Sequence, residues 1–533
     1  MADSITDFDL YRKTTAFTTS PPAVEGTLIQ QLPGSARSFT DGTLPSPDFF
    51  YRLIGHTASG LVIPYNDIAA HGQTGTPGGT LFASALTGRS NDQSRVLASA
   101  VASDGSFYTA GYMQGVINFG GTSVTNTSAA INGFVAKWSS AGQLIWVNAF
   151  SPGNYRGIIT GVSVSSSGQI VIAGTYSAGT INFGGGFTLT NPTITTHSFV
   201  AGLNATTGVG QMAHEFLALD SSNADTATSL AAMATDATGN ILVSGNYSGT
   251  INFGGGITVS GNFSYLAKLS SAGIGIWGVG FGIGGTTPAA IVPSLYPSVD
   301  GSFYIGGTFT APSLNFGNNI IMNNTGDRDG FLVKYSSSGS ALFGRQFGSA
   351  NGGAQYLYGL SQDLDGNILA CGTFTNSINT GAPSPLGAGA FNTLWMGKYT
   401  ATLGYIWSFA FGGDQGDSAF AVTTDSNKNV YITGDNKSPM NFGNNVWSFG
   451  NGVPNVFITK FTQDGLAQWT RRFITNAAFN DGFSIASSPP KPGSTTAVWA
   501  SGFFGGAIDF GNNFTFTSTP SFSDAGFLLK LNP

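Results

Sequence analysis

The sequence predicts an all-β fold, a seven-bladed β-propeller of four-stranded blades, closed by a strand from near the N-terminus and preceded by an irregular N-terminal arm. Three observations predict it. One motif recurs along the chain, each copy contains four strand-like runs, and the two ends of the repeat region complement each other. A long fixed period indicates repeated supersecondary units that bury their faces against one another.

The recurring marker is Asn-Phe-Gly, which becomes Asp-Phe-Gly in the last copy. Its copies lie 63 to 70 residues apart, except for one gap of 126 residues, which is twice 63. A further copy is therefore expected in that gap, where Ser377-Ile378-Asn379 replaces the marker. We expect each marker Phe to pack between neighbouring units. These residues are Phe119, Phe183, Phe253, Phe316, Phe442 and Phe510.

Each copy contains four runs rich in β-branched and aromatic residues. In the sixth copy they are residues 419–423, 430–433, 456–460 and 467–471. The turn at 425–429 supplies Asp and Asn residues that suit a tight hairpin. Four antiparallel strands per unit are typical of a propeller blade. A linear β-solenoid is the alternative, but its coils are usually shorter than this unit.

The two ends of the repeat region favour a closed ring. The last copy ends at Pro533 without its fourth strand, while residues 80–88 resemble 145–153, the fourth strand of the first copy. A ring closed by this borrowed strand removes the free edges of an open array. We therefore divide the chain into an arm at 1–79 and a propeller at 80–533.

The copies resemble a known repeat family, the seven-bladed β-propeller repeat abbreviated SBBP. Its pattern runs G-N-x-Y-x-T-G, then I-D/N-F-G-G, then D-x-F-V-A-K-Y, and residues 429–434 and 329–335 match it closely. The resemblance implies the propeller fold over about residues 80–533. It implies no catalytic residue, because the family has none in common. Members of the family are often exported or surface-associated.

Composition excludes several classes of protein. The net charge is −6 and only 9% of residues are charged, which argues against nucleic-acid binding. No apolar stretch reaches membrane-spanning length, and the acidic start does not resemble a secretory signal. The single Cys371 is expected to be a packed small residue without a disulfide partner.

Residues 1–79 match none of the repeats. Their Pro and Gly residues predict extended or loop structure, with a linker at 72–79. The apolar run at 49–54, followed by 61–65, predicts either a small hairpin on the ring or an anchor that a partner orders. The candidate partner-binding residues are Phe49, Phe50, Tyr51, Leu53, Ile54 and Tyr65.

An acidic residue recurs just before the first strand of several copies. These residues are Asp92, Asp225, Asp417 and Asp481. One interpretation is that each caps its turn through side-chain-to-backbone hydrogen bonds. The other is an acidic ring at one mouth of the propeller that holds a cation or a polar ligand. The four histidines have no metal-ligand spacing. The pattern predicts no catalytic residue and no cofactor, and hence a protein that is not an enzyme.

Low charge, abundant Gly, Asn, Ser, Thr and aromatic residues, and an arm followed by a β-head resemble bacteriophage virion proteins. We therefore expect a structural or binding protein of a virion, such as a tail fibre, tail-tip protein or capsid decoration. It would be part of an oligomeric assembly, contact other virion proteins through residues 1–79, and bind a host-surface glycan or protein. The alternative is a cellular glycan-binding or glycan-cleaving propeller.

Overall fold

The computed structural model describes most of the chain. The described residues are 5–13, 27–33, 49–57, 62–64, 68–70 and 77–533, the last range without 90–91, 127, 166–167, 262–263, 282–289, 350, 389–390, 413–414, 451, 476–479, 488–496 and 519–523. Side chains are described from residue 77 onward. The chain divides into two compact units, Met1–Leu81 with Leu531–Pro533, and Phe82–Lys530. The described residues contain strands and turns but no helix, and therefore no helix that could cross a membrane.

The N-terminal unit contains a five-stranded sheet. Its strands are β1 (Ile5–Lys13), β2 (Thr27–Pro33), β3 (Phe49–Thr57), β4 (Val62–Pro64) and β5 (Ile68–Ala70). The order is β2–β1–β3–β4, and β5 also pairs with β3. The strand pairing predicted for a hairpin of 49–54 with 61–65 is present, since Ile54 pairs with Pro64, while its packing on the ring stays a prediction. The prediction of an irregular arm is wrong, because β1 and β2 extend that hairpin into a sheet.

The signal for β1 is present in the sequence. Apolar and polar residues alternate from Asp7 to Leu10, which is the period of a strand. The nearby Pro and Gly residues outweighed this alternation in the prediction. The register places β1 antiparallel to both β2 and β3, so it occupies the interior of the sheet.

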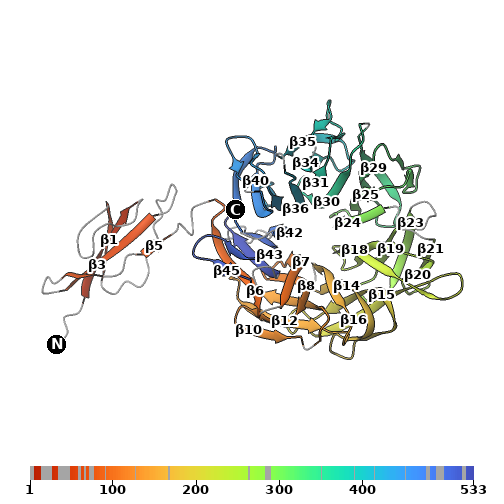
Figure 1. Ribbon diagram of the computed structural model, residues 1–533, viewed down its shortest axis with the longest axis horizontal. Helices are drawn as coiled ribbons and strands as arrows, with labels where there is room; N and C mark the ends of the chain where they lie inside the picture. The colour runs from red at the N-terminus through yellow and green to blue at the C-terminus, as the bar shows by residue number, and fades with distance from the viewer. Residues whose placement is uncertain are drawn as a thin grey trace. The chain divides into compact units, whose positions relative to one another are not determined.

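The second unit is a β-propeller, which confirms the all-β propeller architecture but not the predicted count of seven blades (Figure 1). Six blades are each built from one continuous stretch of chain, as antiparallel sheets whose strand order follows the sequence. Blade 1 contains β7 (Gln93–Val101), β8 (Phe107–Gln114), β11 (Asn132–Trp138) and β12 (Leu144–Phe150), and blade 2 contains β13 (Gly157–Val164), β14 (Ile170–Asn182), β15 (Thr188–Leu203) and β16 (Gly210–Leu219). Blade 3 contains β18 (Thr228–Thr235), β19 (Ile241–Tyr247), β22 (Ser264–Leu269) and β23 (Gly275–Phe281), and blade 4 contains β24 (Ala290–Pro297), β25 (Phe303–Phe309), β28 (Asp329–Tyr335) and β29 (Ala341–Phe347). Blade 5 contains β30 (Gln355–Gln362), β31 (Ile368–Phe374), β34 (Thr393–Tyr399) and β35 (Tyr405–Phe411), and blade 6 contains β36 (Ser418–Thr424), β37 (Val430–Asn436), β40 (Asn455–Phe461) and β41 (Ala467–Phe473).

A further sheet combines the two ends of the repeat region. It contains β42 (Asn480–Ser487), β43 (Val498–Phe504), β46 (Ala525–Leu531) and then β6 (Thr80–Gly88), in that order. Beyond β6 it continues into β9 (Val116–Phe119) and β10 (Thr122–Thr125). Six blades, rather than seven, are therefore built from continuous chain, and we call this sheet the composite blade.

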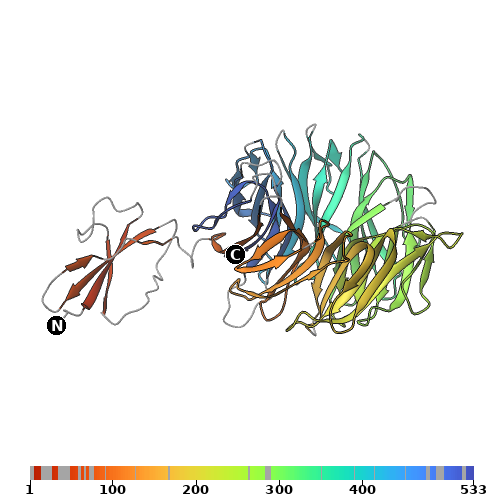
Figure 2. The ribbon, with the colours of Figure 1, turned by 60° about the horizontal axis from the view of Figure 1, so that its bottom comes forward.

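The first strand of each blade lies innermost. These strands contact one another in the order β7, β13, β18, β24, β30, β36 and β42, and β42 contacts β7. The contacts therefore run all the way round the ring (Figure 1). Figure 2 shows that the strands of a blade lie side by side as a twisted sheet.

A glycine on the second strand is required by the geometry of each blade. The inner strand bulges opposite it, and a Cβ at this glycine would lie only 1.8–2.1 Å from an inner-strand carbonyl oxygen. Any other residue would collide with that backbone oxygen. The positions are Gly111, Gly174, Gly245, Gly307, Gly372, Gly434 and Gly502.

The marker segments form turns between the second and third strands. The marker Asn or Asp accepts a hydrogen bond from a following glycine N–H, as Asn252 does from Gly254 at 2.8 Å. Most markers lie at short hairpins, formed by β9–β10, β20 (Thr250–Asn252)–β21 (Thr258–Ser260), β26 (Ser313–Asn315)–β27 (Ile321–Asn323), β32 (Ser377–Ile378)–β33 (Leu386–Gly387), β38 (Met440–Asn441)–β39 (Trp447–Ser448) and β44 (Ala507–Asp509)–β45 (Thr515–Thr517). In blade 2 the marker lies directly between β14 and β15.

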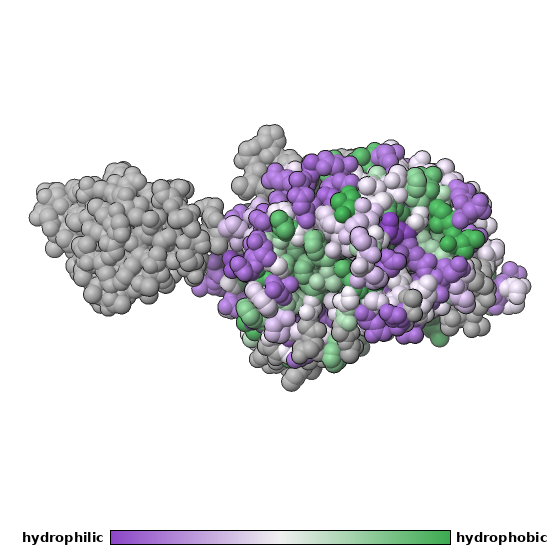
Figure 3. All heavy atoms as spheres, turned by 90° about the horizontal axis from the view of Figure 1, so that it is seen from above, coloured by the Kyte–Doolittle hydropathy of each residue, from purple (hydrophilic) through white to green (hydrophobic). Residues whose placement is uncertain are grey.

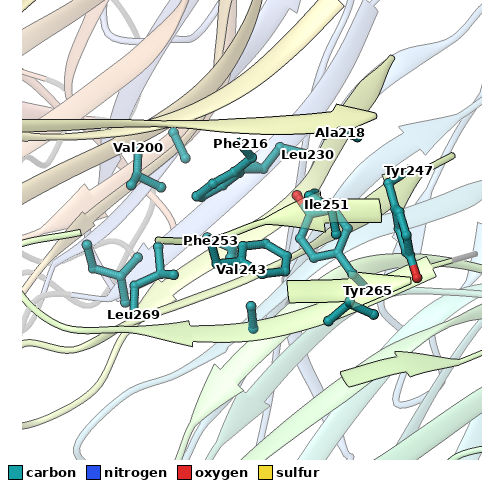
Figure 4. Packing of buried hydrophobic residues seen from close by; sticks show 14 of the residues in the cluster. Val200, Phe216, Ala218, Leu230, Val243, Tyr247, Ile251, Phe253, Tyr265 and Leu269 are labelled. Carbon is teal, nitrogen blue, oxygen red and sulfur yellow. The ribbon is translucent and has the colours of Figure 1, made fainter. Parts of the chain in front are cut away.

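The marker Phe side chains lie in the core. Phe253 packs against Phe216 of the preceding blade at 5.3 Å between ring centroids and against Tyr265 of its own blade at 5.2 Å (Figure 4). Phe183, Phe316, Phe442 and Phe510 make the same pair of contacts in their blades, while Phe119 packs on Phe134.

A tryptophan on the fourth strand joins some blades to the next. The indole N–H of Trp146, Trp277 and Trp407 donates to a turn carbonyl of the following blade, namely Ala205, Ser337 and Gln463, at 3.1–3.2 Å. The third-strand Lys530 donates to the carbonyl of Ser140 at 2.6 Å, which joins the composite blade to blade 1. These Trp residues and Lys530 therefore join neighbouring blades, whereas Lys268 and Lys334 form ion pairs with Asp236 and Asp300 of their own blades.

The surface in Figure 3 shows several small apolar patches separated by polar ones.

Cys371 is fully buried, and burial raises the pKa of its thiol.

Candidate ligand-binding surface on the inner strands

The bulges of the inner strands place one residue outside the ladder in most blades. The skipped residues are Leu97, Thr160, Ala231, Tyr358, Phe420 and Phe483, and in β24 they are Val292 and Pro293. A bulge is a common way to redirect a side chain next to a functional site. Aromatic residues occupy this position on β30, β36 and β42, which are consecutive inner strands.

These aromatic side chains contact one another. The ring centroids of Tyr358 and Phe420 lie 5.6 Å apart, and those of Phe420 and Phe483 lie 5.7 Å apart. Tyr356 stacks on Tyr358 at 5.6 Å, and Phe503 lies 5.4 Å from Phe483. We call these five residues the aromatic arc. All of them except Phe503 are partly exposed.

An arginine lies against each end of the arc. The guanidinium of Arg328 lies 5.1 Å from the ring centroid of Tyr356, and that of Arg95 lies 4.0 Å from Phe503. Arg95 also makes an ion pair with Asp524 at 2.6 Å. Cation–π contacts of this kind hold both guanidinium groups in fixed positions.

Two carboxyl groups accompany the arc. Asp435 on β37 is buried, and its Oδ1 has no hydrogen-bond partner among the described residues. Burial, followed by the charge of Asp481, raises the pKa of Asp435 to about 7. Burial also raises the pKa of Asp481 to about 6, although Arg95 and Lys437 oppose the shift. Burial and then Tyr356 raise the pKa of Tyr358 to about 12, and Asp435 makes a smaller contribution in the same direction, so it lies near the arc.

A glycine allows these two acids to approach. A Cβ at Gly482 would lie 2.4 Å from Thr433 Oγ1 and 3.1 Å from Val456 Cγ1. Since Thr433 shares β37 with Asp435, this close approach of β42 to blade 6 brings Asp481 beside Asp435. Four carboxyls (Asp417, Asp435, Asp481 and Asp524) and two cations (Arg95 and Lys437) influence this region.

Of the four predicted acids, only Asp417 and Asp481 influence Asp435. Asp417 is buried, and its Oδ1 accepts from the backbone N–H of Lys437 at 2.8 Å and of Ser438 at 3.2 Å. Asp92 Oδ2 accepts from the N–H groups of Arg89 and Val116. These two acids cap backbone groups. Among the described residues no group of His, Cys, Asp or Glu is arranged to hold a metal ion.

Asp225 belongs to a separate polar cluster at blade 2. It lies on β17 (Asp225–Thr226), and its Oδ1 lies 2.9 Å from Nε2 of the buried His197. His197 Nδ1 lies 2.6 Å from Glu215, which also accepts from the Tyr176 hydroxyl at 2.6 Å. Burial lowers the pKa of His197, but its bonds to Glu215 and Asp225 raise it overall. His197 therefore joins β17 to the blade.

The candidate partner-binding residues lie in the N-terminal unit. Phe49, Phe50, Tyr51, Leu53 and Ile54 all belong to β3, and Phe50 to Ile54 pair with β1. Tyr65 lies outside the described residues.

The arc and Asp435 were missed by the sequence reasoning, although a signal exists. The residue after the second-strand glycine is Thr or Asn in four copies, but Asp435, Phe503 and Tyr112 occupy it in three consecutive blades. In blade 6 and the composite blade these departures from the repeat coincide with the aromatic bulge residues Phe420 and Phe483. Comparing copies position by position would have found the surface.

The fold and this surface define an all-β propeller with aromatic and acidic side chains on its inner strands. No protein-family model matches the chain. An uncharacterized WD repeat-containing protein of Acanthamoeba polyphaga mimivirus is 24% identical over 185 residues, which cover 30% of this chain and only 13% of that relative.

Similar solved structures include a quinohemoprotein alcohol dehydrogenase of Pseudomonas putida HK5, with a TM-score of 0.39 and 11% identity over 84% of this chain and 76% of that one. A polysaccharide lyase, an ulvan lyase, has a TM-score of 0.37 and 9% identity over 80% of this chain and 93% of that one. TM-scores this low carry no information on function.

Proposed function

We propose that the protein is a non-enzymatic binding protein that recognises a glycan through the aromatic arc and its neighbouring acids. The observation that carries the proposal is the contact of Tyr358, Phe420 and Phe483 across three blades beside the unpartnered carboxylate oxygen of Asp435. Aromatic faces pack against the apolar faces of sugar rings, while carboxylates accept hydrogen bonds from sugar hydroxyls. Binding sites commonly combine such apolar surfaces with a few polar groups.

We propose more specifically that the protein has a role on a virus particle. In this role the N-terminal unit attaches the protein to other virion proteins through β3, and the propeller faces the host surface. It is supported by the low charge and by the arrangement of a separate N-terminal sheet and a large β-head.

The test is binding of the full chain to an array of bacterial surface polysaccharides and eukaryotic glycans. We expect Asp481→Asn and Phe420→Ala to weaken binding to the recognised glycan about tenfold, a loss of about 1.4 kcal/mol. Asp464→Asn, at an exposed turn, and Trp447→Ala, on the exposed hairpin strand β39, serve as controls and should bind normally. An array without any bound glycan, or equal loss in the controls, would overturn the proposal.

A second candidate function is glycan cleavage. It is favoured by the raised pKa values of Asp435 and Asp481, because a carboxyl group that titrates near neutral pH suits general acid–base catalysis. Incubation of the bound glycan with the protein distinguishes the two functions. Release of shorter fragments that Asp435→Asn abolishes would establish an enzyme, and unchanged glycan would favour binding alone.

A further inference from the structure

A pocket that combines polar side chains with apolar lining atoms lies between blades 4 and 5, apart from the aromatic arc. Its volume is about 420 Å³. Blade 4 supplies Gln346 from β29 and Thr325, Ser349 and Asn351 from the adjoining loops, and blade 5 supplies Ser377 and Asn379 from the hairpin that begins with β32. The Oγ atoms of Ser349 and Ser377 lie 2.6 Å apart and join the two sides.

The pocket coincides with the copy that has lost the marker. Thr380 occupies the position of the marker Phe, is fully buried, and shares a hydrogen bond of 2.8 Å with Ser408. Trp395 replaces the missing ring, since its centroid lies 4.9 Å from that of Phe347. The local core is therefore filled by another route, while Ser377 and Asn379 of the eroded marker line the pocket.

The lining is held in place by a buried carboxylate. Asp329 is fully buried, and its Oδ2 accepts from both the N–H and the hydroxyl of Thr325 at 2.9 Å, and from Gln346. The absence of a side chain at Gly348 permits this arrangement, because a Cβ there would lie 2.3 Å from Thr325 Oγ1. Fixing polar groups in advance lowers the entropy lost on binding.

The lining contains hydroxyl and amide groups and no charged or aromatic side chain. Asn379 uses Oδ1 to accept from Gly381 N–H at 3.0 Å, so its Nδ2 group can donate to a ligand. No cation lines the pocket, since the nearby Arg345 donates to the carbonyls of Thr380 and Leu403, and an anion would approach the Asp329 carboxylate, which disfavours phosphate and uronate groups. Neutral hydroxyl and amide groups beside apolar lining atoms, such as those of Pro385, suit a sugar ring, which presents both hydroxyl groups and apolar faces.

We propose that this pocket is a second binding site, which takes one or two rings of a neutral sugar. The pocket uses none of the residues of the aromatic arc, so the proposal can be tested independently of the function proposed above. A sugar chain bound at both places would be held more tightly than at either alone.

The variant Asn379→Asp tests the pocket while preserving the turn. The composite blade already has an aspartate at the equivalent position of its marker turn, where Asp509 accepts a hydrogen bond from the N–H of Gly511 at 2.7 Å. The matched control is Asn252→Asp, since Asn252 makes the same turn in blade 3 but does not line the pocket. Both variants should have the same melting temperature as the native chain.

The probes are N-acetyl-D-glucosamine, D-galactose and D-mannose, with D-glucuronate and Ca²⁺ for comparison, titrated into the full chain and followed by calorimetry. We expect at least one neutral sugar to bind in the millimolar range, Asn379→Asp to weaken it about tenfold, and Asn252→Asp and Asp481→Asn to leave it unchanged. Binding of none of the neutral sugars, equal weakening by Asn252→Asp, or a response to glucuronate or Ca²⁺ in their place would overturn the proposal.

Discussion

Asp435 shows how one departure from the repeat changes the chemistry of a blade. The equivalent residues in blades 2 to 5 are Thr or Asn, which are neutral at every pH. At Asp435 the chain instead places a carboxyl group beside Asp481 in a buried position. The fold therefore has to hold either an uncompensated charge or a bound proton at this point.

The pH dependence of stability should reveal that proton. The pKa of Asp435 rises from 3.8 in the unfolded chain to about 7 in the folded one. A carboxyl with a raised folded pKa stabilises the fold fully below pH 3.8, and this contribution is lost as the pH rises through about 7. Asp435→Asn should therefore be more stable than the native chain at pH 8, by about 2–4 kcal/mol, and the difference should shrink toward pH 5.

Urea unfolding at a series of pH values would measure this effect. Asp104→Asn is a suitable control, because Asp104 lies in an exposed turn. If the unfolding free energy of the native chain changed with pH in the same way as that of Asp435→Asn, this result would contradict the shifted pKa.

At the scale of the elements, the fourth-strand tryptophans allow a clean comparison between neighbouring blades. Trp407 donates its indole N–H to Gln463 of the next blade, whereas the buried Nε1 of Trp469 has no partner among the described residues. Replacing Trp407 with Phe removes a hydrogen bond and should cost about 1 kcal/mol. Trp469→Phe removes an unsatisfied buried donor and should cost less, or stabilise the protein. Chemical denaturation of both variants measures the difference, and equal losses would refute the role of the bond.

Much of each blade could be predicted from the sequence, because the repeat places the same hydrophobic and turn residues at the same intervals. The marker Phe253 and the turn at Asp236 follow from local patterns that need no knowledge of neighbours. The aromatic arc could not be read in this way. Phe420 meets Tyr358 and Phe483 only because bulges on three separate strands occur at the same level. The five-stranded N-terminal sheet was missed because its order, β2–β1–β3–β4, is not fixed by any single segment.

At the scale of the whole molecule, the composite blade decides whether the ring is complete. Deleting residues 525–533 removes β46, which lies between β43 and β6, and leaves two strand edges unpaired. Exposed edges recruit other chains, so the truncated protein should self-associate and lose its sharp unfolding transition. Deleting residues 1–76 leaves β6 and β46 in place and should preserve both properties. Light scattering and thermal unfolding measure the outcome, and a monomeric, cooperatively unfolding truncation would show that closure is dispensable.

The composite blade also imposes an order in time. About 440 residues separate β6 from β46, so at 5–20 residues per second a ribosome makes the second strand about 20 to 90 s after the first. During that interval one edge of β6 can already be paired, because Leu86, Thr87 and Gly88 pair with β9, which is synthesised soon after β6. The hairpin β9–β10 thus covers one edge of β6 until β46 has been synthesised and completes the blade.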